Sequence, residues 1–252
     1  MSKKRIIARI DVKNEFVIKG IHLEGLRKVG KPNEFAKKYY ESGIDEIIFM
    51  DAVAAYYDRN SLSHIIEKAC SDVFVPITVG GGIRNIENIQ TALNSGADKV
   101  AINTQSVKDP SFITQASKVF GSQCIVSSVD AKCIGNRKWE VYVDNGREPT
   151  GINVIEWVKE LELLGAGEIM LTSIDQEGTK KGFDLELNKA VNETVSIPVI
   201  ASGGAGKASD ITKLMIESNV DAAAVASLLH YDLSTISEVK SYLYAEKIKV
   251  RI

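Results

Sequence analysis

Short apolar runs rich in β-branched residues alternate with longer amphipathic segments along the chain. The apolar runs lie at about 5–11, 46–51, 74–79, 98–103, 124–130, 168–173, 197–202 and 222–227. The amphipathic segments carry apolar residues at i, i+3, i+4 and i+7, a pattern that predicts helices burying one stripe. They include 33–43, 85–96, 154–165 and 208–219, with Asn85 and Ser209 as expected N-caps. Eight strand–helix units predict a (β/α)8 TIM barrel, and the alternative is an open doubly wound sheet.

The second half of the chain repeats the first. Three pairs of features recur in the same order, 122 or 119 positions apart: VPITVGGGIR and IPVIASGGAG, Glu46 and Glu168, Asp11 and Asp130. The repeat indicates two half-barrels, at about 1–122 and 123–252, within one domain. It favours a closed barrel, because two halves of four units each cover the other's edges.

Composition narrows the classes of function. The net charge of −2 gives no electrostatic case for binding nucleic acid or an anionic membrane surface. No apolar run approaches the roughly 18 residues of a membrane-spanning helix. The cysteines Cys70, Cys124 and Cys133 are odd in number and lack CxxC spacing, which favours a reducing cytoplasm over disulfides or zinc. The three histidines have no metal-ligand spacing, so we expect neither a metal site nor a cofactor.

Two aspartates end equivalent strands of the two halves. Asp11 closes the run RIIARID and Asp130 closes CIVSSVD. Active sites of TIM barrels lie at the carboxyl ends of the strands, so both side chains should face one mouth. A lone Asp at a strand end is more often a cap or turn residue. Two at equivalent positions predict a general acid–base pair.

Glycine pairs follow two strands and precede helices. Glycine lets the backbone approach an anion, and a helix N-terminus offers free N–H groups. Neither stretch matches GxGxxG or GxxxxGK[ST], so a nucleotide cofactor is not indicated. We expect two phosphate cradles, with the alternative of tight turns that need positive φ. The candidate binding residues are Gly81, Gly82, Asn103 and Thr104 for the first cradle, Gly203, Gly204 and Ser227 for the second, and Thr172, Ser202 and the loop lysine Lys19 beside them.

Four charged residues fall at the opposite, amino-terminal ends of the strands. They are Arg5, Glu46, Lys99 and Glu168. Two cations and two anions from four strands predict a neutral ring that closes the bottom of the barrel. Polar residues on that face usually stabilise the fold, so a structural salt-bridge cluster is the plain interpretation.

Several stretches together resemble one family. RIIARIDVK, TVGGGIR, GADKVAIN, FGSQCIVSSVDAK, LGAGEIMLTSID, GFDLEL and PVIASGGAGK are similar to the HisF family, the cyclase subunit of imidazole glycerol phosphate synthase. The resemblance implies a duplicated barrel with a HisH-type glutaminase docked on its bottom. Ammonia would pass up the barrel axis to a bis-phosphorylated aminoimidazole carboxamide ribonucleotide, PRFAR, which is converted to imidazole glycerol phosphate and AICAR. The two aspartates match the family's catalytic pair, Lys19 and both cradles match its binding residues, and the bottom ring matches its ammonia gate.

The chain also departs from this family at substrate-facing positions. Arg9 stands where the family usually has Cys, Glu177 where it has Asp, and Val53 and Ala55 where it has hydroxyl residues. Arg9 should point into the barrel below Asp11 and hold that carboxyl ionised. The departures resemble HisF paralogues found with surface-polysaccharide genes, so delivery of ammonia to a sugar is the alternative function. A non-catalytic barrel that only binds a glutaminase is the third, and the retained aspartates speak against it.

Overall fold

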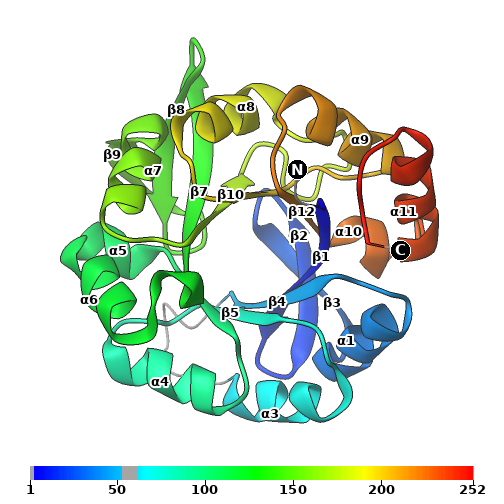
Figure 1. Ribbon diagram of the computed structural model, residues 1–252, viewed down its shortest axis with the longest axis horizontal. Coiled ribbons are helices and arrows are strands. Elements are labelled where there is room, and N and C mark those ends of the chain that lie inside the picture. The colour runs from blue at the N-terminus through cyan, green and yellow to red at the C-terminus, as the bar shows by residue number, and fades with distance from the viewer. Residues whose placement is uncertain (1–2, 53–61, 252) are drawn as a thin grey trace.

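Eight parallel strands form a closed barrel in the computed structural model, which describes residues 3–52 and 62–251 (Figure 1). The strands are β1 (Arg5–Lys13), β4 (Glu46–Asp51), β5 (Ile77–Gly80), β6 (Lys99–Ile102), β7 (Ile125–Gly135), β10 (Glu168–Ser173), β11 (Val199–Ser202) and β12 (Ala222–Val225). Each pairs in parallel with the next, and β12 pairs with β1 to close the ring. The predicted TIM barrel is therefore confirmed. Val53 and Ala55 lie outside the described residues.

Helices surround the barrel and follow its strands. They are α1 (Pro32–Glu41), α3 (Ser63–Asp72), α4 (Ile86–Asn94), α5 (Thr104–Lys108), α6 (Ser111–Phe120), α7 (Val154–Leu163), α8 (Leu185–Thr194), α9 (Ala208–Glu217), α10 (Ser227–His230) and α11 (Ile236–Ala245), with a 3-10 turn η1 (Ser122–Cys124). The Asn85 side chain caps α4 by accepting from the Asn88 backbone, as predicted. Ser209 is not an N-cap, because α9 already begins at Ala208 and Lys207 holds the cap position.

Two antiparallel hairpins extend the barrel strands at its carboxyl-terminal mouth. The first consists of β2 (Phe16–Ile21) and β3 (Glu24–Gly30), and β2 pairs with the end of β1. The second consists of β8 (Lys138–Val143) and β9 (Glu148–Asn153), and β8 pairs with the end of β7. Each hairpin follows the strand that carries one of the two aspartates. The described elements therefore repeat between the halves, while the half-barrel boundary near residue 122 stays a prediction.

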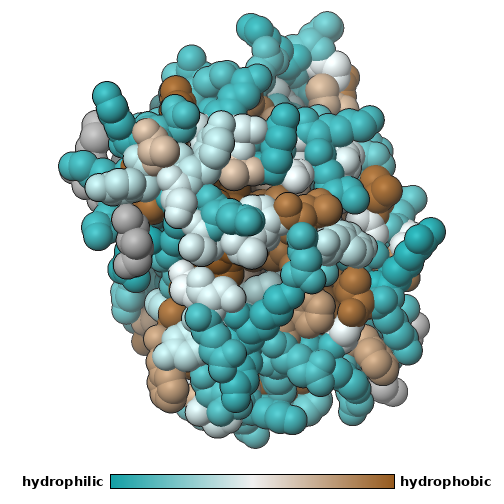
Figure 2. All heavy atoms as spheres, turned by 90° about the vertical axis from the view of Figure 1, so that its right-hand side faces the viewer, coloured by the Kyte–Doolittle hydropathy of each residue, from teal (hydrophilic) through white to brown (hydrophobic). Residues whose placement is uncertain are grey.

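Alternation along the strands separates two apolar layers. On β1, Ile6, Ala8 and Ile10 point outward into the main core, which the surrounding helices cover. Ile7 points inward and joins a second cluster that fills the barrel, formed with Ile48, Ala101, Val126, Met170, Ile200, Ala222 and Ala224. Figure 2 shows the side of the molecule that carries α1 and α11, where hydrophilic side chains cover most of the surface. Among the described residues, no helix is long and apolar enough to cross a membrane.

Candidate active site

Both aspartates lie buried inside the carboxyl-terminal mouth of the barrel. Asp11 is on β1 beside Met50 of β4, and Asp130 is on β7 beside Thr172 of β10. The charges of both carboxylates act on the same guanidinium, that of Arg9, and both raise its pKa. The structure thus brings the predicted pair to one site, while their catalytic roles stay a prediction.

Arg9 lies between the apolar filling of the barrel and the aspartates, and its side chain is almost completely buried. Its Nε donates to Oδ1 of Asp11 at 2.9 Å. Its Nη1 donates to Oγ1 of Thr172 at 2.9 Å and to Oγ of Ser202 at 3.1 Å. A buried guanidinium cannot deprotonate and needs such partners. The placement expected from strand alternation is therefore correct, and its neutralising partner is Asp11.

The environments of the two carboxyl groups differ. Burial alone would raise the pKa of Asp11, but the charges of Arg9 and Lys19 hold it below its ordinary value. Burial also raises the pKa of Asp130, and the nearby Asp11 charge adds to this, so that the pKa reaches about 6 despite the opposing charge of Arg9. Asn103 donates from Nδ2 to Oδ2 of Asp130 at 3.0 Å. One aspartate is thus held as an anion, and the other titrates near neutral pH.

Lys19 belongs to strand β2 rather than to a loop, and its side chain is buried over the mouth. Its Nζ forms an ion pair with Glu177 and lies 3.7 Å from Oδ2 of Asp11. Burial lowers the pKa of this ammonium to about 8, against the opposing effect of Asp11. The expectation of a loop lysine was wrong, because β2 carries it inward as part of a hairpin. Glu177, which stands where the family usually has Asp, is thus the ion-pair partner of Lys19.

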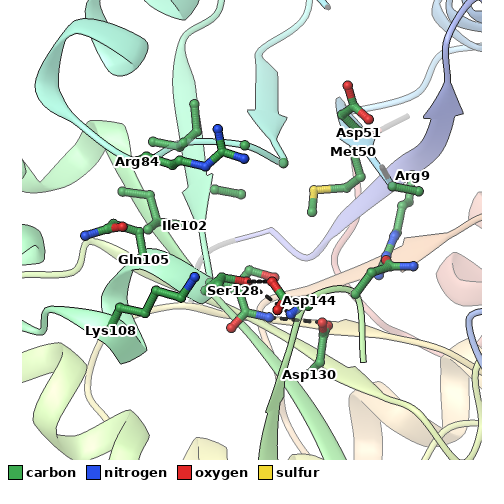
Figure 3. A pocket seen from close by; sticks show the side chains of 18 residues that line it. Arg9, Met50, Asp51, Arg84, Ile102, Gln105, Lys108, Ser128, Asp130 and Asp144 are labelled. Atoms are coloured by element: carbon green, nitrogen blue, oxygen red, sulfur yellow. Dashed lines mark hydrogen bonds between the residues drawn. The ribbon is translucent and has the colours of Figure 1, made fainter. Parts of the chain in front are cut away.

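The first expected cradle lines a cavity of about 90 Å³. Gly81, Gly82, Asn103 and Thr104 lie on its wall together with Arg9 and Asp130. Figure 3 shows Arg84, Gln105 and Lys108 on the opposite side of this cavity from Arg9. The predicted glycine and amide positions are therefore assembled with cationic side chains, a combination suited to an anion.

The cationic residues Arg84 and Lys108 were not identified from the sequence. Signals for both exist. Arg84 lies two residues after the glycine run that follows β5. Lys108 lies four residues after Thr104 on α5, which places Thr104 and Lys108 on one helical face. Only the closure of the barrel shows that the two segments border one cavity.

The second expected cradle lies across the mouth. Ser202, Gly203, Gly204 and Ser227 line a smaller cavity with Lys19. Ser227 begins the short helix α10 after β12. Loops after the last two strands, together with the start of a short extra helix, form a frequent phosphate site of TIM barrels.

Turn geometry alone already requires glycine at both cradles. Gly81 has φ of +93°, and a Cβ there would lie 2.3 Å from the Asp51 carbonyl oxygen. Gly204 has φ of +111°, and a Cβ there would lie 2.0 Å from the carbonyl oxygen of Gly182. Both glycine stretches are therefore tight turns that need positive φ, as the alternative interpretation expected. This geometry is compatible with anion binding, because the same bare backbone lets an anion approach.

The four charged residues at the bottom form a closed ring, called here the charged ring. Arg5 pairs with Glu46 at 2.8 Å and also with Glu168. Lys99 pairs with Glu168 at 3.0 Å and with Glu46 at 3.4 Å. Each cation thus bridges both anions, and the ring closes the axis beneath the apolar filling. The predicted ring is present, while its role as a gate stays a prediction.

The described residues hold no group of three or more His, Cys, Asp or Glu side chains that could bind a metal ion. His230 lies buried behind the site, where its Nδ1 is 2.7 Å from the Tyr39 hydroxyl. Burial lowers the pKa of its imidazole to about 4.

A closed parallel barrel that gathers two unlike carboxyl groups and two glycine-lined cavities at its carboxyl-terminal mouth defines a (β/α)8-barrel enzyme. The chain belongs to the HisF family of histidine biosynthesis proteins. A family model described as "Histidine biosynthesis protein" matches residues 5–235. The chain is 58% identical over 207 residues to "Imidazole glycerol phosphate synthase subunit HisF" of Legionella pneumophila, covering 82% of this chain and 98% of that protein. The resemblance drawn from the sequence motifs is therefore confirmed.

Proposed function

We propose that this protein is the cyclase subunit of imidazole glycerol phosphate synthase and converts PRFAR to imidazole glycerol phosphate and AICAR with ammonia. Family membership supports this proposal. The observation that carries it furthest is the placement of two unlike carboxyl groups between two glycine-lined cavities of one mouth. A substrate with a phosphate at each end would span these cavities and hold its reacting atoms between Asp11 and Asp130.

The chemistry follows from that placement. Fixing both phosphates orients the substrate, which lowers the entropic cost of bringing ammonia and the reacting carbon together. Cleavage and ring closure need a proton donor and a proton acceptor. Asp130, whose pKa is about 6, is suited to exchange protons near neutral pH. Asp11, held ionised by Arg9, stabilises positive charge that develops on the attacking nitrogen.

The partner is a HisH-type glutaminase on the bottom of the barrel. Large apolar side chains are exposed at or just after the carboxyl ends of five helices, at the same end of the barrel as the charged ring. They are Phe74, Val119, Leu163, Ile216 and Tyr244. Exposed apolar residues gathered on one face are typical of a protein-binding surface. Ammonia released there would enter through the charged ring and pass the apolar filling as the neutral molecule. We place the complex in the cytoplasm, in agreement with the free cysteines.

One observation favours a second candidate, transfer of ammonia to a sugar. The resemblance assigns Thr172 and Ser202 to the substrate, but Arg9 already occupies both hydroxyl groups. Arg9→Cys, which restores the usual family residue, decides between the two. The change is neutral or raises PRFAR turnover if PRFAR is the substrate. It abolishes the native activity if Arg9 contacts a sugar substrate.

The proposed function is tested by ammonia-dependent PRFAR turnover in variants of the proton-transferring pair. Asp130→Asn keeps the side-chain volume and is expected to lower the rate by roughly 10²–10⁴, the usual contribution of general acid–base catalysis. Asp72→Asn, at the exposed end of α3, is the matched control and should leave the rate unchanged. Retention of full turnover by Asp130→Asn would contradict the proposed roles.

A further inference from the structure

The repeat between the halves breaks at one pair of positions beside the aspartates. Two residues before Asp11 the chain has Arg9, and two residues before Asp130 it has Ser128. Residues two apart on a strand point to the same side, so both precede their aspartate inside the barrel. Arg9 and Ser128 are each 2% exposed, and both line the first cavity. A full positive charge is thus buried next to one carboxyl group, and a neutral hydroxyl takes the equivalent place beside the other.

We propose that Arg9 is a positioning residue that makes the two aspartates unlike: it fixes Asp11 as a permanent carboxylate and leaves Asp130 as the group that gives up and regains a proton. This proposal rests on the proposed function for its catalytic meaning. Its physical content, the protonation order of two carboxyl groups, is a property of the isolated chain.

Both oxygens of Asp11 face cations. Oδ1 accepts from Nε of Arg9 at 2.9 Å, and Oδ2 lies 3.7 Å from Nζ of Lys19. A proton added to either oxygen would have to sit against one of these positive charges. The guanidinium is itself held by Thr172 and Ser202, so it cannot turn away to make room. Asp11 is therefore unable to serve as a proton donor near neutral pH.

Asp130 has a different set of neighbours. Its Oδ2 accepts from the neutral amide of Asn103, and Thr172 is a second neutral hydrogen-bonding partner. Within the part of the chain that the structure describes, no lysine, arginine or histidine forms an ion pair with it. Arg9 acts on it only at longer range and is opposed by the Asp11 charge.

Other charged groups around the pair leave this order unchanged. The groups acting on Asp11 are Arg9, Lys19 and His230, and those acting on Asp130 are Arg9 and Asp11. Glu177 forms an ion pair with Lys19 and so partly neutralises the charge that Lys19 presents to Asp11. The pKa of His230 is lowered to about 4, so this imidazole is neutral when Asp130 titrates. Asp51, at the end of β4, lines the first cavity with Asp130.

The asymmetry has a catalytic consequence. A general acid works best when its pKa lies near the working pH. With a pKa of about 6 rather than 3.8, Asp130 is protonated on the order of 100-fold more often at neutral pH. It can give its proton to the leaving nitrogen, become a carboxylate, and recover the proton from the attacking nitrogen. Without Arg9 only Lys19 would hold the pKa of Asp11 down, and the difference between the two carboxyl groups would narrow.

The proposal is tested by following the carboxyl ¹³C resonances of both aspartates during a pH titration of the isolated chain. Wild type should show Asp130 titrating near pH 6 and Asp11 well below it. In Arg9→Met, which keeps an unbranched side chain but removes the charge, the Asp11 midpoint should rise by about 1–3 pH units. Arg9→Lys keeps the charge and is the matched control, in which Asp11 should stay low. An Asp11 midpoint that does not move in folded Arg9→Met would overturn the proposal.

A second readout separates positioning from a merely structural role. In Arg9→Met the acid limb of the kcat/KM profile should move to higher pH, whereas a loosened site would lower the rate without moving the limb. If Arg9→Met fails to fold, the wild-type titration decides. Asp130 titrating above Asp11 supports the proposal, and the reverse order overturns it. The titration needs no substrate, so a chain that fails to turn over PRFAR contradicts the proposed function alone.

Discussion

Replacing Asp130 with Asn should stabilise the fold even though it removes activity. The buried carboxyl of Asp130 has a pKa of about 6, above the ordinary value of 3.8. Because the folded-state pKa is the higher one, ionising Asp130 weakens the fold. The stabilising effect of the protonated form is fully present below the unfolded-state pKa and is lost as the pH rises through the folded-state pKa. Asn resembles the protonated carboxyl and can still accept from Asn103, so it removes this penalty.

The size of the effect follows from the pKa difference. A shift from 3.8 to about 6 corresponds to about 3 kcal/mol at 1.36 kcal/mol per unit. Asp130→Asn should therefore raise the free energy of unfolding by about 3 kcal/mol at a pH of about 8. At a pH of about 5 the gain should fall to about half of that, because much of Asp130 is already protonated in the folded state.

Asp11→Asn should have the opposite effect and lower the free energy of unfolding. Its pKa is held low by Arg9 and Lys19, so its carboxylate stabilises the fold above the unfolded-state pKa. Asn at this position leaves the Arg9 guanidinium buried without its anion. Breaking a buried ion pair from one side costs about 3–5 kcal/mol.

Urea unfolding of wild type and both variants at the two pH values measures these differences. If the dependence of the unfolding free energy on urea concentration is the same in all three proteins, a shift in the midpoint urea concentration reports a change in stability. A loss of stability in Asp130→Asn at the higher pH would refute the electrostatic reasoning. A gain that is the same at both pH values would also refute it, since packing rather than ionisation would then be the cause.

Three further predictions address the charged ring and the cradles. Lys99→Ala should uncouple glutamine-driven turnover of the complex while turnover with ammonium salts stays largely intact; equal loss with both nitrogen sources would indicate a structural defect. Crystals soaked in phosphate should show density beside Asn103 and beside Ser227, and density at neither would count against a bis-phosphate ligand. Gly204→Ala should lower the free energy of unfolding by about 2 kcal/mol or more in urea titrations, because it adds a backbone clash to positive-φ strain. The control Gly25→Ala has positive φ but open space, and should cost about 1 kcal/mol; an equal loss in both would rule out the clash.

The barrel itself could be predicted from the sequence. Each strand is a short apolar run, and the helices between them keep a clear 3.6-residue period, which survives without tertiary information. Repetition of these units then favoured closure. Boundaries were less exact: the predicted runs at 74–79 and 197–202 begin later in the structure, at Ile77 and Val199.

The two hairpins were missed. The β8–β9 turn carries a recognisable signal, Asn145-Gly146, with positive φ at both residues. The β2–β3 turn carries none, because His22 and Leu23 adopt positive φ without glycine. Its conformation is fixed by a distant segment, since the His22 backbone N–H donates to the Glu177 carbonyl at 2.8 Å. Missing this hairpin is the reason that Lys19 was expected in a loop.

The candidate site was predictable in its positions but not in its pairings. Strand alternation placed Arg9 inside the barrel next to Asp11. Its bonds to Thr172 and Ser202 join strands 163 and 193 residues away in sequence, which no local pattern can indicate. The same holds for the pairing of Lys19 with Glu177.

PRFAR turnover by the purified wild-type chain with saturating ammonium and no glutaminase tests the central claim most directly. The proposed function predicts imidazole glycerol phosphate and AICAR in equal amounts, at a typical enzyme rate on the order of 1 s⁻¹ or more. A folded chain that shows no detectable turnover of PRFAR under these conditions would contradict it.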